Sequence, residues 1–365
     1  MSVRNQNGID FSTRLSVALK SVVTAYREKR DRLRVNAGAE YTAKPTVFFL
    51  TPDHQAPAGG IQVIYRHVDI LNSAGINACV LHQRRGFRCT WFENETPVCY
   101  IDDTRVLRGD ILVLPEICVS LASSLPLGIR YVVFNQNTHL TWKNDNEAVR
   151  RAYRASGDFV GALTVSKHNC DMLQYAFPEI EVSRIHLGID PETFYPASSQ
   201  RSKRIAYMPR RGLDDAKQVL RLLERRSALD GWEIVALSGL SHQQVAEELS
   251  RTRVFLAFTR QEGFGLPAAE AMACGCYVIG NDGFAGSEFF KDEFASSVAT
   301  GDVLGFAETV ERIVEHETTE PGWCELRGSR ASRFIHSEYS LKRERDEVVS
   351  AYTSFLGIQR ERALA

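Results

Sequence analysis

Apolar runs alternate with helix-like periods along the first half of the chain. The segment Thr46–Thr51 (TVFFLT) is a short apolar run rich in β-forming residues. After a polar loop, the stretch from 61 to 75 repeats its apolar positions with the period of a helix. Four further runs predict strands: Ile76–His82, Asp110–Leu114, Tyr131–Phe134 and Ala162–Val165. Such runs, with helical stretches between several of them, are typical of a parallel sheet covered on both faces.

The second half repeats this pattern. Its periodicity predicts helices at Asp214–Arg226 and Ser241–Ser250, and strands at Arg204–Met208, Glu233–Leu237, Val254–Phe258 and Tyr277–Ile279. Between the halves, residues 187–203 (LGIDPETFYPASSQRSK) are rich in turn formers, and we interpret them as a linker. The predicted fold is α/β, with two doubly wound, Rossmann-like domains facing a central cleft. Ligands of such sheets usually bind at the strand ends.

The first 44 residues are predicted to form a helical extension. Phe11, Leu15, Leu19, Val22 and Tyr26 fall on one helical face, and a basic segment from 27 to 34 follows. Two interpretations remain open: an amphipathic helix on a membrane surface, or a helix packed on its own domain. No apolar run approaches the roughly 20 residues of a spanning helix. We therefore expect a cytoplasmic protein, with peripheral membrane contact as an option.

Composition narrows the functional classes. The net charge is −1, from 44 basic and 45 acidic residues among 365, so the chain is not a polycation for nucleic acid. Eight cysteines occur without a C-x-x-C pair, which predicts small buried side chains rather than a zinc or disulfide framework.

One segment combines a glycine-containing loop with two acidic residues. RQEGFGLPAAEAMACGC, from 260 to 276, runs from a glycine-containing loop into a predicted helix, Pro267–Cys274. The N–H groups at the start of such a helix bind phosphate or another anion. Glu262 lies in the loop, and Glu270 is predicted in the first turn, where an acid complements the helix dipole. The residues that would face an anion are Gly263, Phe264, Gly265 and Leu266.

The chain resembles the retaining glycosyltransferases of the GT-B fold, specifically glycosyltransferase family 4. EGFGLPAAEAMACG fits the family's E-x7-E element, with Glu262 and Glu270 as its two acids. TVSKHNCDMLQYAF followed by IHLGIDPETFYP is similar to the passage that ends the family's first domain. The glycine pair Gly59-Gly60 after the first strand is a third landmark. The resemblance covers most of residues 45 to 335.

The resemblance implies an activity and a domain plan. The family moves a sugar from a nucleoside diphosphate sugar to an acceptor hydroxyl with retention, here in the assembly of a bacterial polysaccharide or glycoconjugate. Residues 45–195 would be the acceptor-side domain and 196–339 the nucleotide-sugar-binding domain. The last stretch, 340–365, would cross back and complete the first domain. The acceptor would be a glycan or a lipid-linked glycan.

The resemblance also implies roles for the two acids. Glu262 would accept hydrogen bonds from the transferred sugar, and Glu270 from the ribose hydroxyls. A simpler alternative pairs Glu262 with Arg260 or another arginine.

The chain departs from the family pattern in the basic residues that are expected to bind the diphosphate. The family usually carries G-R after a strand and a lysine about five residues later. Here the strand ends AYMPRRGLDDAKQ, which places Arg210 and Arg211 near the expected arginine and Lys217 six or seven residues on. We expect the arginine pair to bind the diphosphate, while Lys217 either joins it or begins a helix face. No D-x-D occurs, so fixed cations and the helix end are expected to act without a metal or other cofactor.

The segment VVFNQNTHLTW, 132–142, is predicted to lie on the other side of the cleft. This segment ends a strand with Asn135 and Gln136, and His139 resembles the histidine that the family often presents near the sugar. A lone histidine also has structural roles. Gly59 and Gly60, which lack side chains, allow close approach of a phosphate or of the acceptor hydroxyl.

Other classes fit less well. A Rossmann dehydrogenase needs G-x-G-x-x-G after the first strand, and Gly59-Gly60 does not supply it. Two alternatives stay open: a GT-B epimerase or hydrolase of nucleotide sugars, and a non-catalytic subunit that binds a nucleotide sugar.

Overall fold

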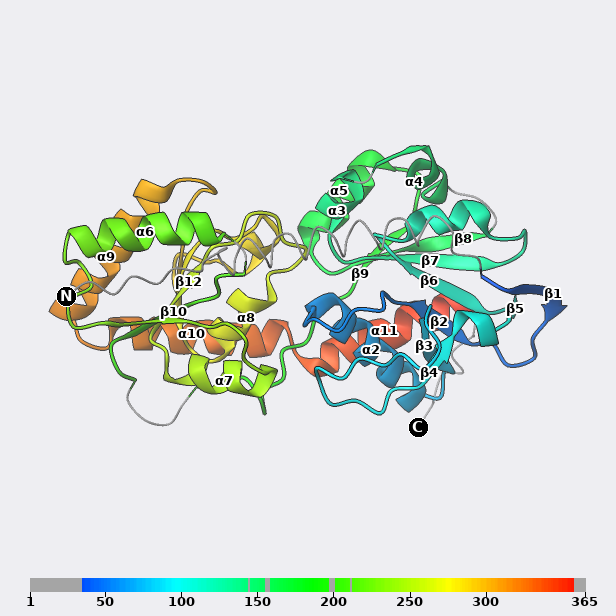
Figure 1. The fold of residues 1–365 in the computed structure, drawn as a ribbon, viewed down its shortest axis with the longest axis horizontal. Helices are drawn as coiled ribbons and strands as arrows, with labels where there is room; N and C mark the ends of the chain where they lie inside the picture. Colours follow the sequence, from blue (N-terminus) through cyan, green and yellow to red (C-terminus); the bar gives the residue numbers. More distant parts are fainter. Residues whose placement is uncertain (1–34, 144, 155–157, 197–200, 211, 358–365) are drawn as a thin grey trace, which may run out of the picture.

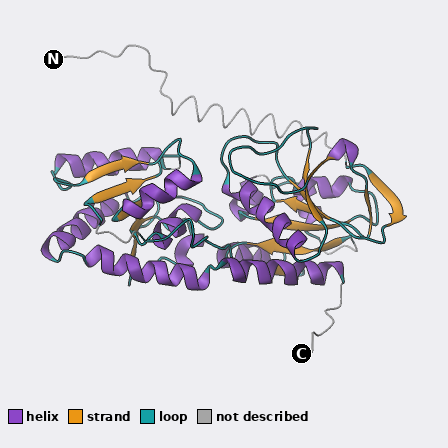
Figure 2. Cartoon of the chain, turned by 90° about the horizontal axis from the view of Figure 1, so that it is seen from below, coloured by secondary structure: helices purple, strands orange, loops and turns teal. Residues whose placement is uncertain are grey.

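Two lobes lie side by side in the computed structural model, which describes residues 35–143, 145–154, 158–196, 201–210 and 212–357 (Figure 1). Each lobe contains a parallel sheet with helices on both faces (Figure 2). The α/β architecture with two doubly wound domains that the apolar pattern predicted is therefore confirmed.

The first lobe is built on a seven-stranded parallel sheet of order β4-β3-β2-β6-β7-β8-β9. All four residues of its central strand β2 are buried, as expected for a strand covered on both faces. The strands are β2 (Val47–Leu50), β3 (Ala78–His82), β4 (Val98–Tyr100), β6 (Ile111–Pro115), β7 (Arg130–Asn135), β8 (Phe159–Thr164) and β9 (Val182–Arg184). The helices are α2 (Gly59–Ser73), α3 (Thr138–Lys143), α4 (Glu147–Ala152) and α5 (Lys167–Ala176), with short 3₁₀ turns η1 (Ile101–Asp103) and η2 (Val119–Ser124).

The second lobe is built on a five-stranded parallel sheet of order β11-β10-β12-β13-β14. Helix α6 packs with α9 in this lobe, and α8 packs with α7 and α10. The strands are β10 (Arg204–Tyr207), β11 (Glu233–Ala236), β12 (Val254–Ala257), β13 (Tyr277–Gly280) and β14 (Ala295–Ser297). The helices are α6 (Leu213–Arg225), α7 (His242–Arg251), α8 (Leu266–Ala273), α9 (Val303–Thr319) and α10 (Trp323–Glu338), with the 3₁₀ turn η3 (Ala285–Glu288).

The last described helix, α11 (Leu341–Leu356), leaves the second lobe and packs against α2 of the first (Figure 1). The ring of Tyr352 lies 5.4 Å from that of Phe49 in β2. Glu344 is fully buried and forms an ion pair with Arg66 of α2, Nε to Oε2 at 2.8 Å and Nη2 to Oε1 at 2.8 Å. The helix therefore joins the first domain's core.

Two features differ from the sequence-based expectations. Part of the predicted helical extension is a strand, β1 (Ala37–Tyr41), which pairs in parallel with β5 (Val106–Arg108); residues 1–34 lie outside the described part of the chain. Four of its five residues stay at least partly exposed, so backbone pairing rather than an apolar pattern forms it. Cys79 and Cys99 are joined by a disulfide, because β4 lies beside β3, a neighbourhood that the cysteine spacing does not encode.

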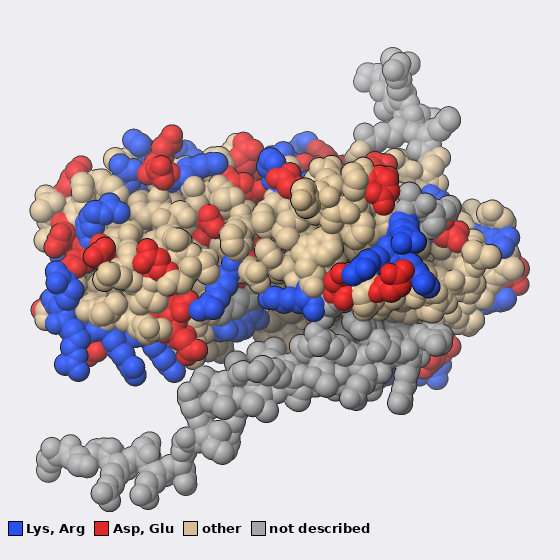
Figure 3. All heavy atoms as spheres, turned by 90° about the horizontal axis from the view of Figure 1, so that it is seen from above, with Lys and Arg blue, Asp and Glu red and all other residues tan. Residues whose placement is uncertain are grey.

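The surface carries both signs of charge. Acidic and basic side chains are intermixed on the face shown in Figure 3, in agreement with the net charge of −1. Within the described residues, none of the helices combines the length and apolar character that crossing a membrane requires.

Candidate active site

The segment 260–276 forms a loop followed by a helix, as its glycine and proline positions predict. Gly265 precedes α8 with a left-handed φ of 99°, and Pro267 occupies the first turn. The N–H groups of Ala268 and Ala269 donate to the Gly265 carbonyl at 3.1 and 3.2 Å. The N–H of Leu266, at the first helical position, has no acceptor within the helix and is available to an anion.

The far end of α8 also matches the prediction, but Glu270 does not lie where expected. The helix ends at Ala273, and Gly275 adopts a left-handed φ of 78° just beyond it. Glu270 falls in the second turn instead of the first, because the helix begins one residue earlier than predicted. The dipole effect fades within the first turn, so it gives little reason for an acid at this position.

Glu262 lies in a tight, buried position. Its exposed fraction is 8%, and its N–H donates to the Gly283 carbonyl at 3.0 Å. Gly283 has a left-handed φ of 63°, and a Cβ on it would lie 3.0 Å from the Glu262 Cγ, so a larger residue there would be strained and crowded. Arg260 does not pair with Glu262: its guanidinium lies 3.0 Å from both carboxylate oxygens of Asp215.

The loop that carries Glu262 is docked on the first domain. A Cβ on Gly263 would lie 1.6 Å from the Gln136 carbonyl oxygen, so only glycine fits. The Asn169 side chain donates to the carbonyls of both residues, at 3.2 Å to Gln136 and 3.1 Å to Gly263. Asn137 donates to the Gln261 carbonyl at 3.3 Å. Sequence reasoning did not single out Asn169, although it lies in the family-like passage TVSKHNCDMLQYAF.

Two helix N-termini meet at this interface. Gly59 is the first residue of α2, and a Cβ on it would lie 2.8 Å from Cδ1 of Leu266, the first residue of α8. The Gly60 carbonyl accepts a hydrogen bond from the Gln136 side chain at 3.0 Å. Each helix start carries a partial positive charge, so their meeting produces a local preference for an anion.

The side chain of Arg210 reaches the start of α2. Arg210 follows β10 and donates from Nη1 to the Pro57 carbonyl, 2.8 Å away, just before α2 begins. Arg211 lies outside the described residues. Lys217 lies on α6 with an exposed side chain. The start of α6 is held against β12, because a Cβ on Gly212 would lie 2.3 Å from the Phe258 carbonyl oxygen.

Glu270 has a partner that sequence reasoning missed. His242, at the start of α7, places Nε2 at 3.4 Å from a carboxylate oxygen of Glu270. The hydrogen bond to this carboxylate raises the pKa of His242. A histidine that begins a helix has no motif signal of its own, so only the packing of α7 on α8 identifies it.

The last residue of β7, Asn135, and the residue that follows it, Gln136, have different surroundings. Asn135 is fully buried, and its amide donates to Thr141 and Tyr153 at 2.8 Å each, so it joins elements inside the first domain. Gln136 lies at the interface, and its N–H donates to Glu116 at 3.2 Å. Burial raises the pKa of Glu116 to about 7. This carboxylate at the end of β6 was also missed, because nothing in its local sequence marks it.

His139 belongs to a cluster of rings. It lies on α3 with Nε2 at 3.2 Å from Nε2 of His168 on α5. Phe284 of the second domain covers both rings, with centroids 5.7 Å from His139 and 5.6 Å from His168. Burial is the main cause that lowers the pKa of each histidine. His139 is therefore at the interface, beside the strand segment that faces Glu262.

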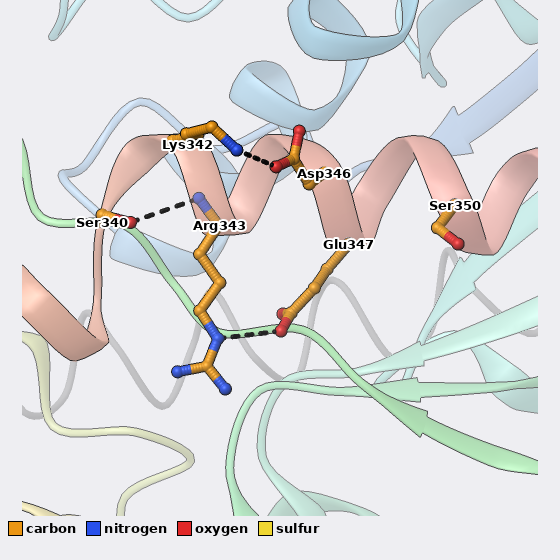
Figure 4. A pocket seen from close by; sticks show the side chains of 6 residues that line it. All are labelled: Ser340, Lys342, Arg343, Asp346, Glu347 and Ser350. Carbon is orange, nitrogen blue, oxygen red and sulfur yellow. Dashed lines mark hydrogen bonds and ion pairs between the residues drawn. The ribbon is translucent and has the colours of Figure 1, made fainter. Parts of the chain in front are cut away.

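A separate hollow lies along α11. Its volume is about 740 Å³, and it is lined by Ser340, Lys342, Arg343, Asp346, Glu347 and Ser350 (Figure 4). Lys342 pairs with Asp346 at 2.6 Å and Arg343 with Glu347 at 3.1 Å. These charges satisfy one another, and we assign the hollow no role.

Comparison with solved structures defines the fold. The chain is similar to sucrose-phosphate synthase from Thermosynechococcus elongatus, with a TM-score of 0.64, 12% identity, and coverage of 86% of this chain and 100% of that one. It is also similar to Anabaena HepE solved with UDP and glucose, with a TM-score of 0.60, 12% identity, and coverage of 85% and 100%. The fold is GT-B, as the resemblance predicted.

Sequence comparison adds the activity class. Residues 159–316, which include both acids and Arg210, match the family model described as glycosyl transferases group 1. An alpha-1,6-glucosyltransferase of Actinobacillus pleuropneumoniae serotype 7 (strain AP76) is 25% identical over 317 residues, covering 80% of this chain and 90% of that protein. Together these matches and the fold support a glycosyltransferase of the GT-B fold.

Proposed function

We propose that this glycosyltransferase moves a sugar from a nucleoside diphosphate sugar to an acceptor hydroxyl with retention, in the assembly of a bacterial polysaccharide or glycoconjugate. The observation that carries the proposal is that the start of α2 contacts the first residue of α8, Gly59 against the Leu266 side chain, while Arg210 binds the Pro57 carbonyl just before α2. Negative charge grows on the diphosphate as the bond to the sugar breaks. Helix ends and a fixed cation stabilise that charge.

The two acids bind separate parts of the donor. Glu270 accepts from the ribose hydroxyls, and His242 at 3.4 Å keeps its carboxylate oriented. Glu262 accepts from hydroxyls of the transferred sugar, and His139 lies on the opposite side of the same interface. The structural neighbour solved with UDP and glucose supports a nucleotide-sugar donor, and the relative named as a glucosyltransferase supports a hexose.

The reaction proceeds without a metal in this proposal. The positive charge near the leaving group comes from arginine and the two helix ends, which are already in place before the donor binds. Retention follows from attack on the face of the sugar that the diphosphate leaves. The acceptor is a glycan or a lipid-linked glycan bound by the first domain.

One experiment tests the donor and the stereochemistry together. UDP, GDP, ADP and CMP are first compared by thermal shift, because a ligand selective for the folded state raises its melting temperature. The matching hexose donor is then incubated with a simple acceptor glycoside, and the anomeric proton of the product is read by NMR. We expect a product with the donor's configuration. An inverted product contradicts retention, and release of free sugar instead points to a hydrolase.

A further inference from the structure

The contact between His139 and His168 is a hydrogen bond between two ring nitrogens. Their Nε2 atoms are 3.2 Å apart, the ring centroids are 5.1 Å apart, and the planes differ by 28°. The two ring planes are thus inclined to each other by less than 30°, and the rings contact each other through their Nε2 atoms. An N–H···N bond needs one hydrogen between the two nitrogens, so the neutral rings take opposite roles and each fixes the tautomer of the other.

Phe284 of the second domain covers this histidine pair and has an unusual backbone conformation. Phe284 stacks on His168 with an interplanar angle of 17°. Its backbone has φ 69° and ψ −50°, a conformation that non-glycine residues rarely adopt. Its N–H donates to the Asp282 side chain at 2.8 Å, and its strand segment pairs with Glu262. Strain of this kind persists where a surrounding structure requires it, often at a functional site.

Burial is the main cause that lowers the pKa of both histidines. Lys143 on α3 and His168 itself lower the pKa of His139 in addition to burial. Asp171 on α5 and Asp282 of the second domain act in the opposite direction on His168, but burial is larger. A neutral pair suits a site where the transferred sugar becomes positively charged, because an imidazolium there would repel it.

We propose that His168 is a positioning residue for His139: the bond between their Nε2 atoms, covered by Phe284, fixes the ring plane and tautomer that His139 presents to the donor sugar. This role rests on the proposed glycosyl transfer. His168 itself does not touch the substrate in this assignment. It acts through His139, and the second domain completes the arrangement only when it lies against the first.

Two variants at one position separate the hydrogen bond from ring packing. His168→Phe keeps an aromatic ring beside Phe284 but loses the ring nitrogen. His168→Gln loses the ring but keeps an amide N–H that can donate. His316→Gln on the outer helix α9 serves as the matched control, since His316 is exposed and pairs with Glu320. Steady-state transfer is measured from pH 5 to 9 for each protein, with melting temperatures to confirm folding.

The expected pattern distinguishes positioning from general destabilisation. His168→Phe lowers kcat about tenfold with little change in the donor KM, and His168→Gln restores part of that loss. In His168→Phe the acidic limb of the kcat profile moves to higher pH, because His139 no longer has a second histidine beside it. The control retains the wild-type profile.

Specific results would overturn the assignment. Wild-type kcat and an unshifted acidic limb in His168→Phe would show that the bond does not matter. A loss of kcat in His168→Gln larger than that in His168→Phe would show that ring packing, not the hydrogen bond, is what His168 supplies. If His168→Phe does not fold, His168→Leu, which also lacks a hydrogen-bonding group, takes its place, and a His139 tautomer that ¹⁵N NMR finds unchanged in that variant overturns the proposal. A wild-type protein that transfers no sugar refutes the proposed function instead.

Discussion

The two sides of the interdomain site are encoded differently. On the second-domain side, one continuous segment supplies Glu262, the α8 N-terminus and Glu270. On the first-domain side, the contacts come from separate segments: Gly59 starts α2, Gln136 follows β7, and Asn169 lies on α5. One side is thus a local motif, and the other is an assembly that exists only after folding. Variants on each side should therefore fail in different ways.

The largest effect is expected where the two sides touch. Gly263→Ala places a Cβ 1.6 Å from the Gln136 carbonyl oxygen, which a rigid backbone cannot avoid. The domains must separate, and a displacement of about 1 Å can cost on the order of a hundredfold in rate. We expect at least that loss in kcat, together with a larger radius of gyration by X-ray scattering.

A glycine away from the interface provides the control for that variant. Gly231 also has a left-handed φ, 81°, but a Cβ there meets nothing within 4 Å. Gly231→Ala should lower stability by about 1 kcal/mol through backbone strain and leave kcat unchanged. If Gly263→Ala behaves like this control, the contact with Gln136 does not set the domain arrangement.

Arg210 tests whether fixed charge supports the reaction. Removing a donor that stabilises transition-state charge costs about 3 kcal/mol, or on the order of a hundredfold in rate. We expect that loss in Arg210→Ala and a smaller one in Arg210→Lys, which keeps the charge without the fork. Initial rates are measured with and without EDTA, and full activity is expected in chelator. Activity that vanishes in EDTA and returns with magnesium or manganese contradicts the metal-free proposal.

The two acids of the local motif should separate binding from turnover. Glu270→Ala is expected to weaken binding of the free nucleoside diphosphate about tenfold, because its ribose hydrogen bonds exist without the sugar. Glu262→Ala should leave that binding nearly unchanged and lower kcat. Isothermal titration and initial rates measure the two effects. Equal loss of nucleotide binding in both variants would refute the assigned roles.

Phe284 lies between the two sides of the interdomain site. Because its backbone is strained, one substitution there should change stability and activity in opposite directions. Phe284→Gly relieves a positive φ, so the free energy of unfolding should rise by up to about 1 kcal/mol, offset by the lost ring contacts. The cover over His139 is lost at the same time, and kcat should fall. Chemical denaturation and steady-state rates are compared, with Phe284→Leu as the variant that keeps an apolar side chain. A variant with lower stability and normal kcat would show that the residue is only structural.

The smallest effect concerns the pH dependence of stability. Glu270 raises the pKa of His242, so the protonated histidine favours the folded state. That contribution is fully present below the ordinary pKa of about 6.5 and is lost as pH rises through the raised value. The side chain is 40% exposed, which screens the pair. The melting temperature of His242→Gln should fall below wild type by on the order of 1 °C at pH 6 and match it at pH 9. An equal difference at both pH values would refute the linkage.

The sequence by itself determined the elements and the local motif. The apolar runs became strands of both sheets with ends shifted by at most three residues. Most of these strands are central, and burial on both faces leaves a continuous apolar signal. Gly265, Pro267 and Gly275 fixed the bounds of α8 to within one residue, since their backbone preferences act locally. What the pattern missed was largely edge structure. Strand β1 lacks a clear apolar run, and the Cys79–Cys99 pair depends on which strands become neighbours.

Only the tertiary structure decided which residues of the first domain reach the site. Asn135 and Gln136 are adjacent in sequence, yet one is buried among Thr141 and Tyr153 while the other contacts the second domain. Asn169 and His168 carry no motif of their own, and they become important because α5 places them beside Gly263 and His139. Helix and turn chemistry acts over a few residues and can be read from the chain. Contacts between segments 29 to 124 residues apart depend on sheet order and domain packing, which no local pattern specifies.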